Sequence, residues 1–305
     1  MAKRERQFDE RVLEQFRVEL IGYCYRLLGS AFEAEDAVQE TLVRAWQKFD
    51  RFDADRGPLR SWVYTITTNV CLDMLRSAQR RARATDFSPA AEPGPELGMP
   101  LPERTWVQPI PDSRAVPASA DLAEQLVQRE TIRLAFIAAL QHLPPRQRAV
   151  LILRDVLCWR TDEVAGLLGT TSASISSALQ RARSTLKAVH TAPAEPFQPT
   201  NPVQQRLLAR YCAAFERYDV ETLVSLLHED AIMSMPPFPW WLRGRANIRT
   251  ALLGAGRPCE GVRLVPTLAN GSPAYAQYRP AGPPGEYEAF ALTLVEVWEG
   301  QITEM

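Results

Sequence analysis

Apolar residues recur every three or four positions through the first part of the chain. One run precedes the Gly57-Pro58 break and a second follows it: Val38, Leu42, Trp46 and Phe49, then Val63, Ile66, Val70 and Met74. This spacing puts side chains on one face of a helix, and proline suits the first turn of a helix. Residues 8–83 are therefore predicted to form an all-helical module.

A second helical pattern occupies residues 121–190. The Leu143-Pro144-Pro145 step separates an amphipathic segment from a second segment that runs through residues 150–157. The apolar positions of the first segment are Leu122, Leu126, Ile132, Phe136 and Leu140. Both segments have the spacing of helices, so a second all-helical module is predicted.

The pattern changes period in residues 203–305. Two helical stretches, at 207–217 and 220–227, precede a predicted strand at 231–235. Further on, Phe290, Leu292 and Leu294 alternate with Ala291, Thr293 and Val295, which is the two-residue period of a strand. Helices packed against a mostly antiparallel sheet, an α+β domain, are expected here.

Proline-containing segments separate the three modules. Residues 84–120 hold eight prolines and little periodic apolar pattern, which neither a helix nor a central strand tolerates. Residues 191–202 form a second, shorter proline-containing hinge. The predicted architecture is multidomain, with two all-α domains, a linker between them, and a C-terminal α+β domain.

The formal net charge of −1 conceals an uneven distribution. Lys and Arg outnumber Asp and Glu by 15 to 13 in residues 1–83 and by 9 to 6 in residues 121–191. Acidic residues exceed basic ones by 5 to 2 in residues 84–120 and by 12 to 9 in residues 192–305. A basic balance on the two helical modules favours contact with a phosphate backbone, although the excess is too small to establish it.

The cysteine pattern and the apolar runs exclude several classes of protein. Five widely spaced cysteines, with no C-x-x-C and only three histidines, do not predict a disulfide framework, a zinc site or another metal centre. Reduced thiols packed as small apolar side chains are expected instead. The longest apolar run, residues 134–140, is far shorter than the roughly 20 residues that span a bilayer. We expect a cytoplasmic chain with no membrane segment and no cofactor.

The sharpest local motif lies at residues 161–183. A short helix presents Val164, Ala165 and Leu168, Gly169 supplies a turn, and a second helix begins near Ser172. This is the spacing of a helix-turn-helix, whose second helix enters the major groove of DNA. A tight corner between two helices is the structural alternative. DNA binding is favoured because the exposed face carries side chains that suit bases and phosphates: Ser174, Ser177, Gln180, Arg181 and Arg183.

Two polar faces in the first module are also candidate sites. Asp36, Gln39, Glu40 and Arg44 lie opposite the apolar stripe, which by itself is typical of a solvated face. The next predicted helix aligns polar and basic side chains beside an aromatic ring, as binding of single-stranded DNA requires. These residues are Trp62, Asn69, Asp73, Arg76 and Arg80, extended by Arg81 and Arg83.

Two motifs in order resemble one known family. Residues 23–46 (YCYRLLGSAFEAEDAVQETLVRAW) resemble the core of bacterial RNA polymerase sigma factors of the extracytoplasmic-function group. Residues 143–155 (LPPRQRAVLILRD), followed by the helix-turn-helix, resemble the second conserved domain of those proteins. The resemblance covers nearly all of residues 10–190 and is specific because both motifs occur in order across a linker.

The resemblance implies roles for the candidate residues. Asp36, Gln39, Glu40 and Trp46 match the face that docks on the clamp helices of the beta-prime subunit of core RNA polymerase, although Trp46 also lies on the predicted core stripe. The loop at 50–57 and the helix with Asn69, Asp73 and Arg76 match the part that captures bases of the minus-ten element. The helix-turn-helix matches the part that reads the minus-thirty-five element and, with its domain, meets the beta flap. Promoter DNA and core polymerase are the implied partners.

The sequence departs from the family pattern in the helix-turn-helix. Ser176 and Ala178 occupy positions where many relatives carry basic residues. Fewer phosphate contacts follow, so we expect the isolated second domain to bind DNA weakly and in a salt-sensitive manner.

The C-terminal module resembles a SnoaL-like cone domain, which a subset of these sigma factors carries. The resemblance rests on residues 207–219, Met235-Pro236-Pro237 and residues 241–245 (WLRGR). Its candidate pocket residues are Tyr211, Phe215, Trp240 and Trp241, which could equally fill a core. The chain ends at Met305, just after the Glu299-Gly300 turn, where relatives usually complete another strand. We expect either the domain or the sequence to be shortened there.

A non-enzymatic alternative sigma factor is the function predicted. The C-terminal domain is expected to contact the linker or the sigma domains and to bias them between closed and promoter-competent arrangements. One alternative is an enzyme in which His228, Glu229 or Asp230 serves as the base of the cone and the helical part is a DNA-binding sensor. Another is a simple helix-turn-helix repressor, which leaves the 36–46 face without a partner.

Overall fold

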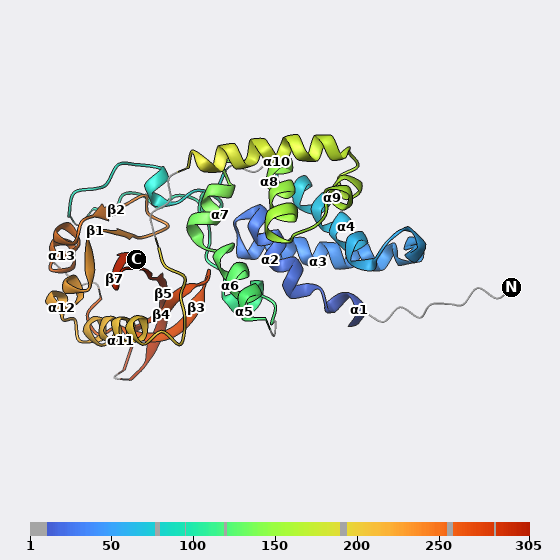
Figure 1. The fold of residues 1–305 in the computed structure, drawn as a ribbon. Coiled ribbons are helices and arrows are strands. Elements are labelled where there is room, and N and C mark those ends of the chain that lie inside the picture. The colour runs from blue at the N-terminus through green and yellow to red at the C-terminus, as the bar shows by residue number, and fades with distance from the viewer. Residues whose placement is uncertain are drawn as a thin grey trace. The chain divides into compact units, whose positions relative to one another are not determined.

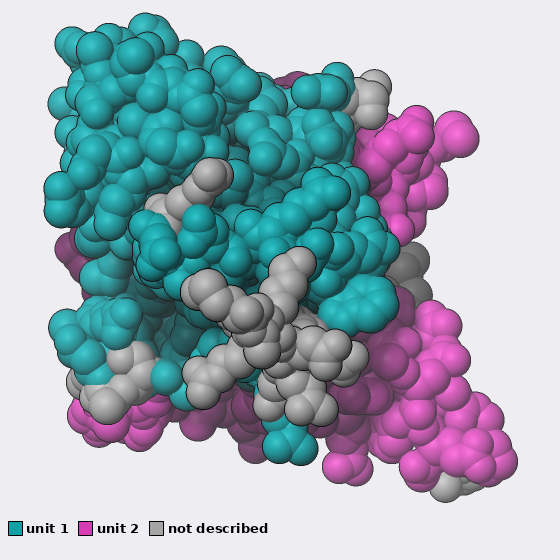
Figure 2. Space-filling view, turned by 90° about the vertical axis from the view of Figure 1, so that its right-hand side faces the viewer, with its two compact units in different colours: residues 1–81, 107–191 teal, residues 82–106, 192–305 magenta. Residues whose placement is uncertain are grey.

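A computed structural model describes residues 11–76, 80–94, 96–118, 121–189, 194–254, 259–283 and 285–305. The chain forms two compact units, which Figure 2 distinguishes by colour. Unit 1 comprises residues 1–81 and 107–191, and unit 2 comprises residues 82–106 and 192–305. The chain thus leaves unit 1 after Arg81, returns at Val107, and leaves it again near residue 191.

Unit 1 is helical (Figure 1). Its N-terminal part contains α1 (Arg11–Glu14), α2 (Arg17–Leu28), α3 (Ala31–Gln47), two short 3-10 turns η1 (Phe49–Arg51) and η2 (Ala54–Arg56), and α4 (Leu59–Met74). The left-handed conformation of Gly29 and the Ser30 cap turn the chain between α2 and α3. The return segment of unit 1 contains α5 (Asp112–Ala115), α6 (Leu122–Glu130), α7 (Leu134–Leu140), α8 (Pro145–Leu151), the π-helical turn η5 (Ile152–Val156), α9 (Thr161–Leu167) and α10 (Ser172–Lys187).

Two predicted helices in unit 1 have different bounds. The single amphipathic segment expected after residue 121 is broken at residues 131–133, so that α6 and α7 are separate helices. The helix expected to carry Asn69, Asp73, Arg76 and Arg80 ends at Met74. Only Asn69 and Asp73 of those four residues therefore lie on α4.

A common core joins the two sequence segments of unit 1. Leu20, Leu27 and Val38 belong to the same buried cluster as Ile137, Leu140 and Ile152. An aromatic contact crosses between them as well, because the rings of Tyr64 on α4 and Trp159 lie 4.9 Å apart. The two helical modules predicted from the sequence are thus packed together as one unit.

Two buried arginines cross the same boundary. Arg26 of α2 donates to Thr131 Oγ1 at 2.8 Å and to Gln128 Oε1 at 2.7 Å. Arg148 of α8 donates to the carbonyl of Leu27 and to Gln141 Oε1, the latter at 2.7 Å. Burial lowers the pKa of each guanidinium to about 10, so both remain charged at neutral pH. These acceptors are neutral oxygens. The packing of the two segments therefore depends on complete hydrogen bonding of both buried guanidinium groups.

Unit 2 combines helices with two sheets. Its C-terminal part contains α11 (Pro202–Glu216), α12 (Val220–Ser225), β1 (Leu227–Ser234), β2 (Trp241–Arg243), α13 (Arg245–Leu252), β3 (Arg263–Ala269), β4 (Ser272–Pro280), β5 (Tyr287–Leu294), β6 (Glu296–Trp298) and β7 (Gln301–Glu304). One sheet has the order β2-β1-β7-β6 and the other β3-β4-β5. The pairings are antiparallel except that β1 and β7 run parallel.

The end of the described chain forms a strand. The turn at Glu299 and Gly300 joins β6 to β7, and β7 pairs with both β6 and β1. Residues 301–304 therefore lie inside the four-stranded sheet.

The proline-rich stretch is divided between the two units. Residues 82–106 belong to unit 2 and include the turns η3 (Ala84–Asp86) and η4 (Glu103–Thr105). Residues 107–118 pack in unit 1, where the backbone N–H of Gln108 donates to the carbonyl of Gly29 at 3.0 Å and Ile110 is fully buried. The stretch expected to be a linker alone therefore contributes to both units.

Candidate polymerase and nucleic-acid interfaces

The outer face of α3 is exposed and partly apolar. Its inner face buries Ala34, Ala37, Val38, Thr41, Leu42 and Ala45. The stripe therefore continues from Leu42 to Ala45, and Trp46 turns outward with 58% of its surface exposed. This corrects the placement of Trp46 on the core stripe, because a 3.6-residue period reaches position 45 before position 46.

Trp46 shares this outer face with the predicted polar residues and with two apolar residues that sequence reasoning missed. Asp36, Gln39 and Glu40 are exposed, and Glu40 pairs with Arg44 at 2.6 Å. Phe32 is 66% exposed and Val43 is also exposed. Positions 32, 36, 39, 43 and 46 alternate steps of four and three residues, so they form one stripe along the helix. That repeat was the available signal for Phe32 and Val43.

An exposed aromatic stripe is typical of surfaces that meet another protein. Exposed large apolar side chains that recur along one helix are unusual on a surface that faces only water. Aromatic residues are enriched among the residues that dominate binding between proteins. We define the docking face of α3 as Phe32, Asp36, Gln39, Glu40, Val43 and Trp46.

The second candidate surface lies on and after α4. Asn69, Asp73 and Arg76 are exposed, and Arg76 pairs with Asp73 at 3.4 Å. Trp62 is half-buried and its ring packs against Phe52 at 5.5 Å and Phe49 at 6.2 Å. These aromatic contacts fix the loop that precedes α4 against the start of the helix.

Arg80 has a different environment. It lies beyond the end of α4 and its Nη2 atom is 2.9 Å from Nε2 of His142. The prediction that one helix aligns Asn69, Asp73, Arg76 and Arg80 is therefore wrong for Arg76 and Arg80, which both follow Met74. Arg81 likewise turns inward and pairs with Glu33 at 2.5 Å.

The helix-turn-helix has the predicted geometry. α9 buries Val164 and Ala165, Gly169 adopts φ +60°, and α10 begins at Ser172 behind the Thr171 cap. Ile175, Leu179 and Ala182 of α10 face the core. The five predicted DNA-binding residues, Ser174, Ser177, Gln180, Arg181 and Arg183, are all exposed.

Arg183 carries an ion pair that the sequence pattern did not indicate. Its Nη2 and Nε atoms lie 2.7 and 2.9 Å from the two carboxylate oxygens of Asp155 in η5. This hydrogen-bonded pair raises the pKa of Arg183. Its two-pronged geometry fixes the direction in which the guanidinium points.

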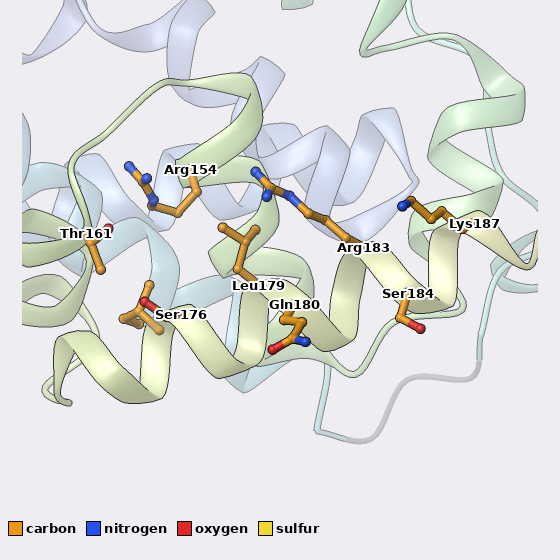
Figure 3. A pocket seen from close by; sticks show the side chains of 9 residues that line it. Arg154, Thr161, Ser176, Leu179, Gln180, Arg183, Ser184 and Lys187 are labelled. Atoms are coloured by element: carbon orange, nitrogen blue, oxygen red, sulfur yellow. The ribbon is translucent and has the colours of Figure 1, made fainter.

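A pocket of about 510 Å³ lies beside the same helix (Figure 3). Its walls come from α10, the start of α9 and η5. We call it the flank pocket, lined by Arg154, Thr161, Ile175, Ser176, Leu179, Gln180, Arg183, Ser184 and Lys187. Figure 3 shows the side chains of Arg154, Arg183 and Lys187 on the same side of α10.

The candidate pocket residues of the C-terminal domain have two different environments. Tyr211, Phe215 and Trp240 are buried in the core of unit 2, and the Tyr211 ring packs against those of Phe215 and Tyr275. Burial raises the pKa of Tyr211 above its usual value. Trp241 is half-buried, and its indole N–H donates to the carbonyl of Ser88 at 2.9 Å. Trp241 thus contacts residues 82–106, the first sequence segment of unit 2.

The three candidate bases of the cone lie on a strand. His228, Glu229 and Asp230 belong to β1, which begins at Leu227, so the strand predicted at 231–235 starts earlier than expected. Asp230 is exposed and lies 3.5 Å from Arg243, and the Asp230 backbone N–H donates to His228 Nδ1 at 3.1 Å. An exposed, ion-paired carboxylate does not lie in an enclosed site where it could take a proton from a bound substrate.

The cysteines are free, but their burial differs. Cys24 and Cys71 are buried with their sulfur atoms 3.5 Å apart, and burial raises the pKa of Cys24. Cys158 is exposed, so the expectation of packed thiols is wrong for that residue. In the described part of the chain, no group of His, Cys, Asp and Glu side chains could hold a metal ion, and no helix is long and apolar enough to cross a membrane.

Most of the chain matches three known protein families. Residues 12–81 match Sigma-70 region 2, residues 133–186 match Sigma-70 region 4, and residues 208–305 match the SnoaL-like domain.

Individual relatives agree with the family matches. The ECF RNA polymerase sigma factor SigG of Mycobacterium tuberculosis H37Rv is 46% identical over 274 residues, which are 88% of this chain and 73% of SigG. SigJ of the same strain is 34% identical over 217 residues, 71% of this chain and 61% of SigJ. The crystal structure of Mycobacterium tuberculosis SigJ superposes with a TM-score of 0.59 at 25% identity and covers 97% of this chain and 94% of that one.

These matches explain the observed architecture and leave the enzyme and repressor alternatives without support. Helical regions 2 and 4 are followed by a mixed α/β SnoaL-like domain. The chain belongs to the ECF sigma factors of RNA polymerase, which are non-enzymatic transcription initiation factors.

Proposed function

We propose that this sigma factor is held in a closed arrangement by its C-terminal domain, which captures the linker between regions 2 and 4. We further infer that the docking face of α3 binds the clamp helices of the beta-prime subunit. The exposed residues on and after α4 then contact the minus-ten element, and those of α10 contact the minus-thirty-five element. The domain of α10 also meets the beta flap, and the chain works in the cytoplasm with the polymerase.

One observation carries the proposal: the captured linker forms a loop whose two ends meet. The backbone N–H of Ala82 donates to the carbonyl of Thr105 at 2.9 Å, and Ala82 pairs with Trp106 as a β-bridge. An extended chain spans at most about 3.3 Å per residue, so the 25 residues of 82–106 could reach roughly 80 Å. Because its two ends are paired, the loop adds almost nothing to the distance that the linker can span between regions 2 and 4.

The C-terminal domain supplies the contacts that hold the loop. The backbone N–H of Ala91 donates to the carbonyl of Trp241 and that of Leu101 to the carbonyl of Pro237, both at 2.8 Å. The Ser88 hydroxyl donates to the carbonyl of Pro239 at 2.8 Å. Arg83 lies 3.4 Å from Glu304 of β7. Release of these contacts lengthens the tether and lets regions 2 and 4 separate along a promoter.

Transcription by core RNA polymerase tests the sigma roles and the regulation together. The promoters are chosen by genome-wide enrichment of polymerase bound to the chain. Run-off assays compare the intact chain, a chain that ends at residue 195, and Glu40→Lys. We expect the shortened chain to give more transcript and Glu40→Lys to give almost none, because a cation replaces an anion on the docking face of α3.

A single substitution in the intact chain tests the loop contact itself. Trp241→Phe keeps the ring but removes the N–H that donates to Ser88, and Trp298→Phe in β6 is the matched control. Pairs of labels on regions 2 and 4 report their separation in solution. Longer separations and more transcript with Trp241→Phe alone support the proposal. Unchanged separations and unchanged transcript in both Trp241→Phe and the shortened chain contradict the regulatory part and leave the sigma assignment standing.

A further inference from the structure

The flank pocket is rich in positive charge and hydroxyl groups. Arg154, Arg183 and Lys187 contribute three cationic side chains, and Thr161, Ser176 and Ser184 contribute hydroxyls. The one carboxylate paired with these cations among the described residues is that of Asp155. Three cations against one anion leave a surplus of positive charge around an open space of about 510 Å³.

Two of the three cations have unused hydrogen-bonding capacity within the described chain. Lys187 is exposed and forms no ion pair there. Arg154 donates from Nη1 to the carbonyl of Trp159, while its buried Nε has no acceptor in the described part. A buried N–H without an acceptor destabilises the fold, so a ligand oxygen that reached this place would be favoured.

We propose that the flank pocket binds a phosphate group, and that Asp155 competes with this phosphate for the Arg183 guanidinium. The proposal deepens the assigned role of α10 and rests on it where the phosphate belongs to the DNA backbone. A free phosphate compound is the other source of the same chemistry.

Phosphate fits the groups that line the pocket. A guanidinium offers parallel N–H donors that match two phosphate oxygens, and an ammonium adds a point charge. Serine and threonine hydroxyls commonly donate to phosphate oxygens in DNA complexes.

The position of the pocket fits DNA as the source of that phosphate. Ser176, Arg183 and Lys187 share one flank of α10 by their spacing of seven and four residues. Ser177 and Arg181, which are proposed to face the bases and backbone, lie on other sides of the same helix. A phosphate contact beside base-reading residues fixes the register of the helix in the groove.

Asp155 opposes phosphate binding at this site. Its carboxylate already occupies the guanidinium edge of Arg183 with two contacts of 2.7 and 2.9 Å. A phosphate must displace or share that edge and also approach a negative charge. Asp155 therefore lowers affinity for every DNA sequence and acts as a positioning residue for Arg183.

The test measures duplex binding by the intact chain as a function of salt. The probe is a fluorescein-labelled 30-base-pair duplex of mixed sequence, followed by anisotropy between about 50 and 200 mM NaCl, the range over which phosphate contacts dominate salt dependence. The variants are Lys187→Ala, Asp155→Asn and the double variant Asp155→Asn/Arg183→Ala. Arg206→Ala, an exposed cation on α11 of unit 2, is the matched control for loss of one charge.

Each phosphate contact changes the slope of log K against log salt by about 0.9. We expect Lys187→Ala to flatten the slope by this amount and Asp155→Asn to steepen it, with the double variant cancelling the gain. Arg206→Ala should leave the slope unchanged. These substitutions are at exposed positions, and a thermal melt checks that each variant folds as the parent does.

A second arm distinguishes the source of the phosphate. Inorganic phosphate, pyrophosphate and ATP are titrated into the intact chain by calorimetry. Binding of one of them that is lost in Lys187→Ala, with no slope change on DNA, supports the site with a free compound as its ligand. Slope changes on DNA without such binding support the backbone as its ligand.

The proposal is overturned if Lys187→Ala and Asp155→Asn match Arg206→Ala on DNA and no titrated phosphate binds. That result is distinct from failure of the assigned α10 role. Run-off transcription with Arg181→Ala separates them, because a loss of transcript there keeps α10 as the DNA-reading helix even when the flank pocket is inert.

Discussion

Helices α3 and α10 are built by the same local physics and present opposite outer chemistry. They are 17 and 16 residues long, and each begins behind a hydroxyl cap that accepts from the third backbone N–H beyond it. Ser30 caps Glu33 and Thr171 caps Ser174, both at 3.2 Å. Each helix buries one apolar stripe in the same core of unit 1.

The outer faces differ in the kind of partner they suit. The docking face of α3 carries Phe32, Val43 and Trp46 among acidic and amide groups, whereas α10 exposes serines, Gln180, arginines and Lys187. Apolar area gains free energy from contact with another apolar surface, and cations gain it from counterion release on a nucleic acid. Capping and core stripe therefore determine that a helix forms, and its outer residues determine what it meets.

The largest expected difference between the two faces is in how strongly salt weakens binding to their partners. With three phosphate contacts, from Arg181, Arg183 and Lys187, duplex affinity should fall roughly forty-fold between about 50 and 200 mM salt. Affinity for core polymerase should fall only a few-fold, because salt screens the charges of Asp36 and Glu40 but not the apolar contacts of Phe32, Val43 and Trp46. Anisotropy titrations of the intact chain with duplex and with core polymerase measure both. Equal salt dependence of the two interactions would contradict the division.

Removal of the exposed indole on α3 should come next in size. Trp46→Ala is expected to weaken binding to core polymerase by about 2 kcal/mol, roughly thirty-fold, as truncation of an aromatic anchor does. Thermal stability should stay within about 0.5 kcal/mol of the parent because the side chain is exposed. Val203→Ala on α11, also an exposed apolar residue, is the control. Parental affinity of Trp46→Ala would remove α3 from the interface.

Loss of one α10 cation should give the reciprocal result. Arg181→Ala is expected to reduce duplex affinity about five-fold, or about 1 kcal/mol, while binding to core polymerase stays at the parental level. Gel shifts with duplex and pull-downs with core polymerase, run on the same preparation, provide the comparison. A variant that loses both activities would point to a folding defect in place of a lost contact.

The smallest effect should be shared by the two helices. Ser30→Ala and Thr171→Ala each remove an N-cap hydroxyl, which costs about 1 kcal/mol of stability. Ser30 is buried and also donates to Gln108, so its loss should be the larger of the two. Urea denaturation measures the difference. A larger loss for Thr171→Ala would show that α10 depends on its cap more than its packing indicates.

The sequence determined the local elements and the family. The periodicity marked α3, α4 and the helix-turn-helix, Gly169 marked the turn, and two motifs in order identified regions 2 and 4. The exposed serines, Gln180 and arginines of α10 were found because period and residue type suffice for an outward face. These features depend on residues close together in the chain.

Tertiary structure decided the features that depend on residues far apart. Trp46 points outward because the other side of α3 packs against the core of unit 1. The ion pair of Asp155 with Arg183 joins residues 28 positions apart. The packing of residues 84–120 partly in one unit and partly in the other was also a tertiary outcome. The contact of Trp241 with Ser88 joins residues about 150 positions apart. Composition showed that the stretch could not be a helix, but not that the C-terminal domain would hold it, because long-range packing selects among conformations that local propensity leaves equal.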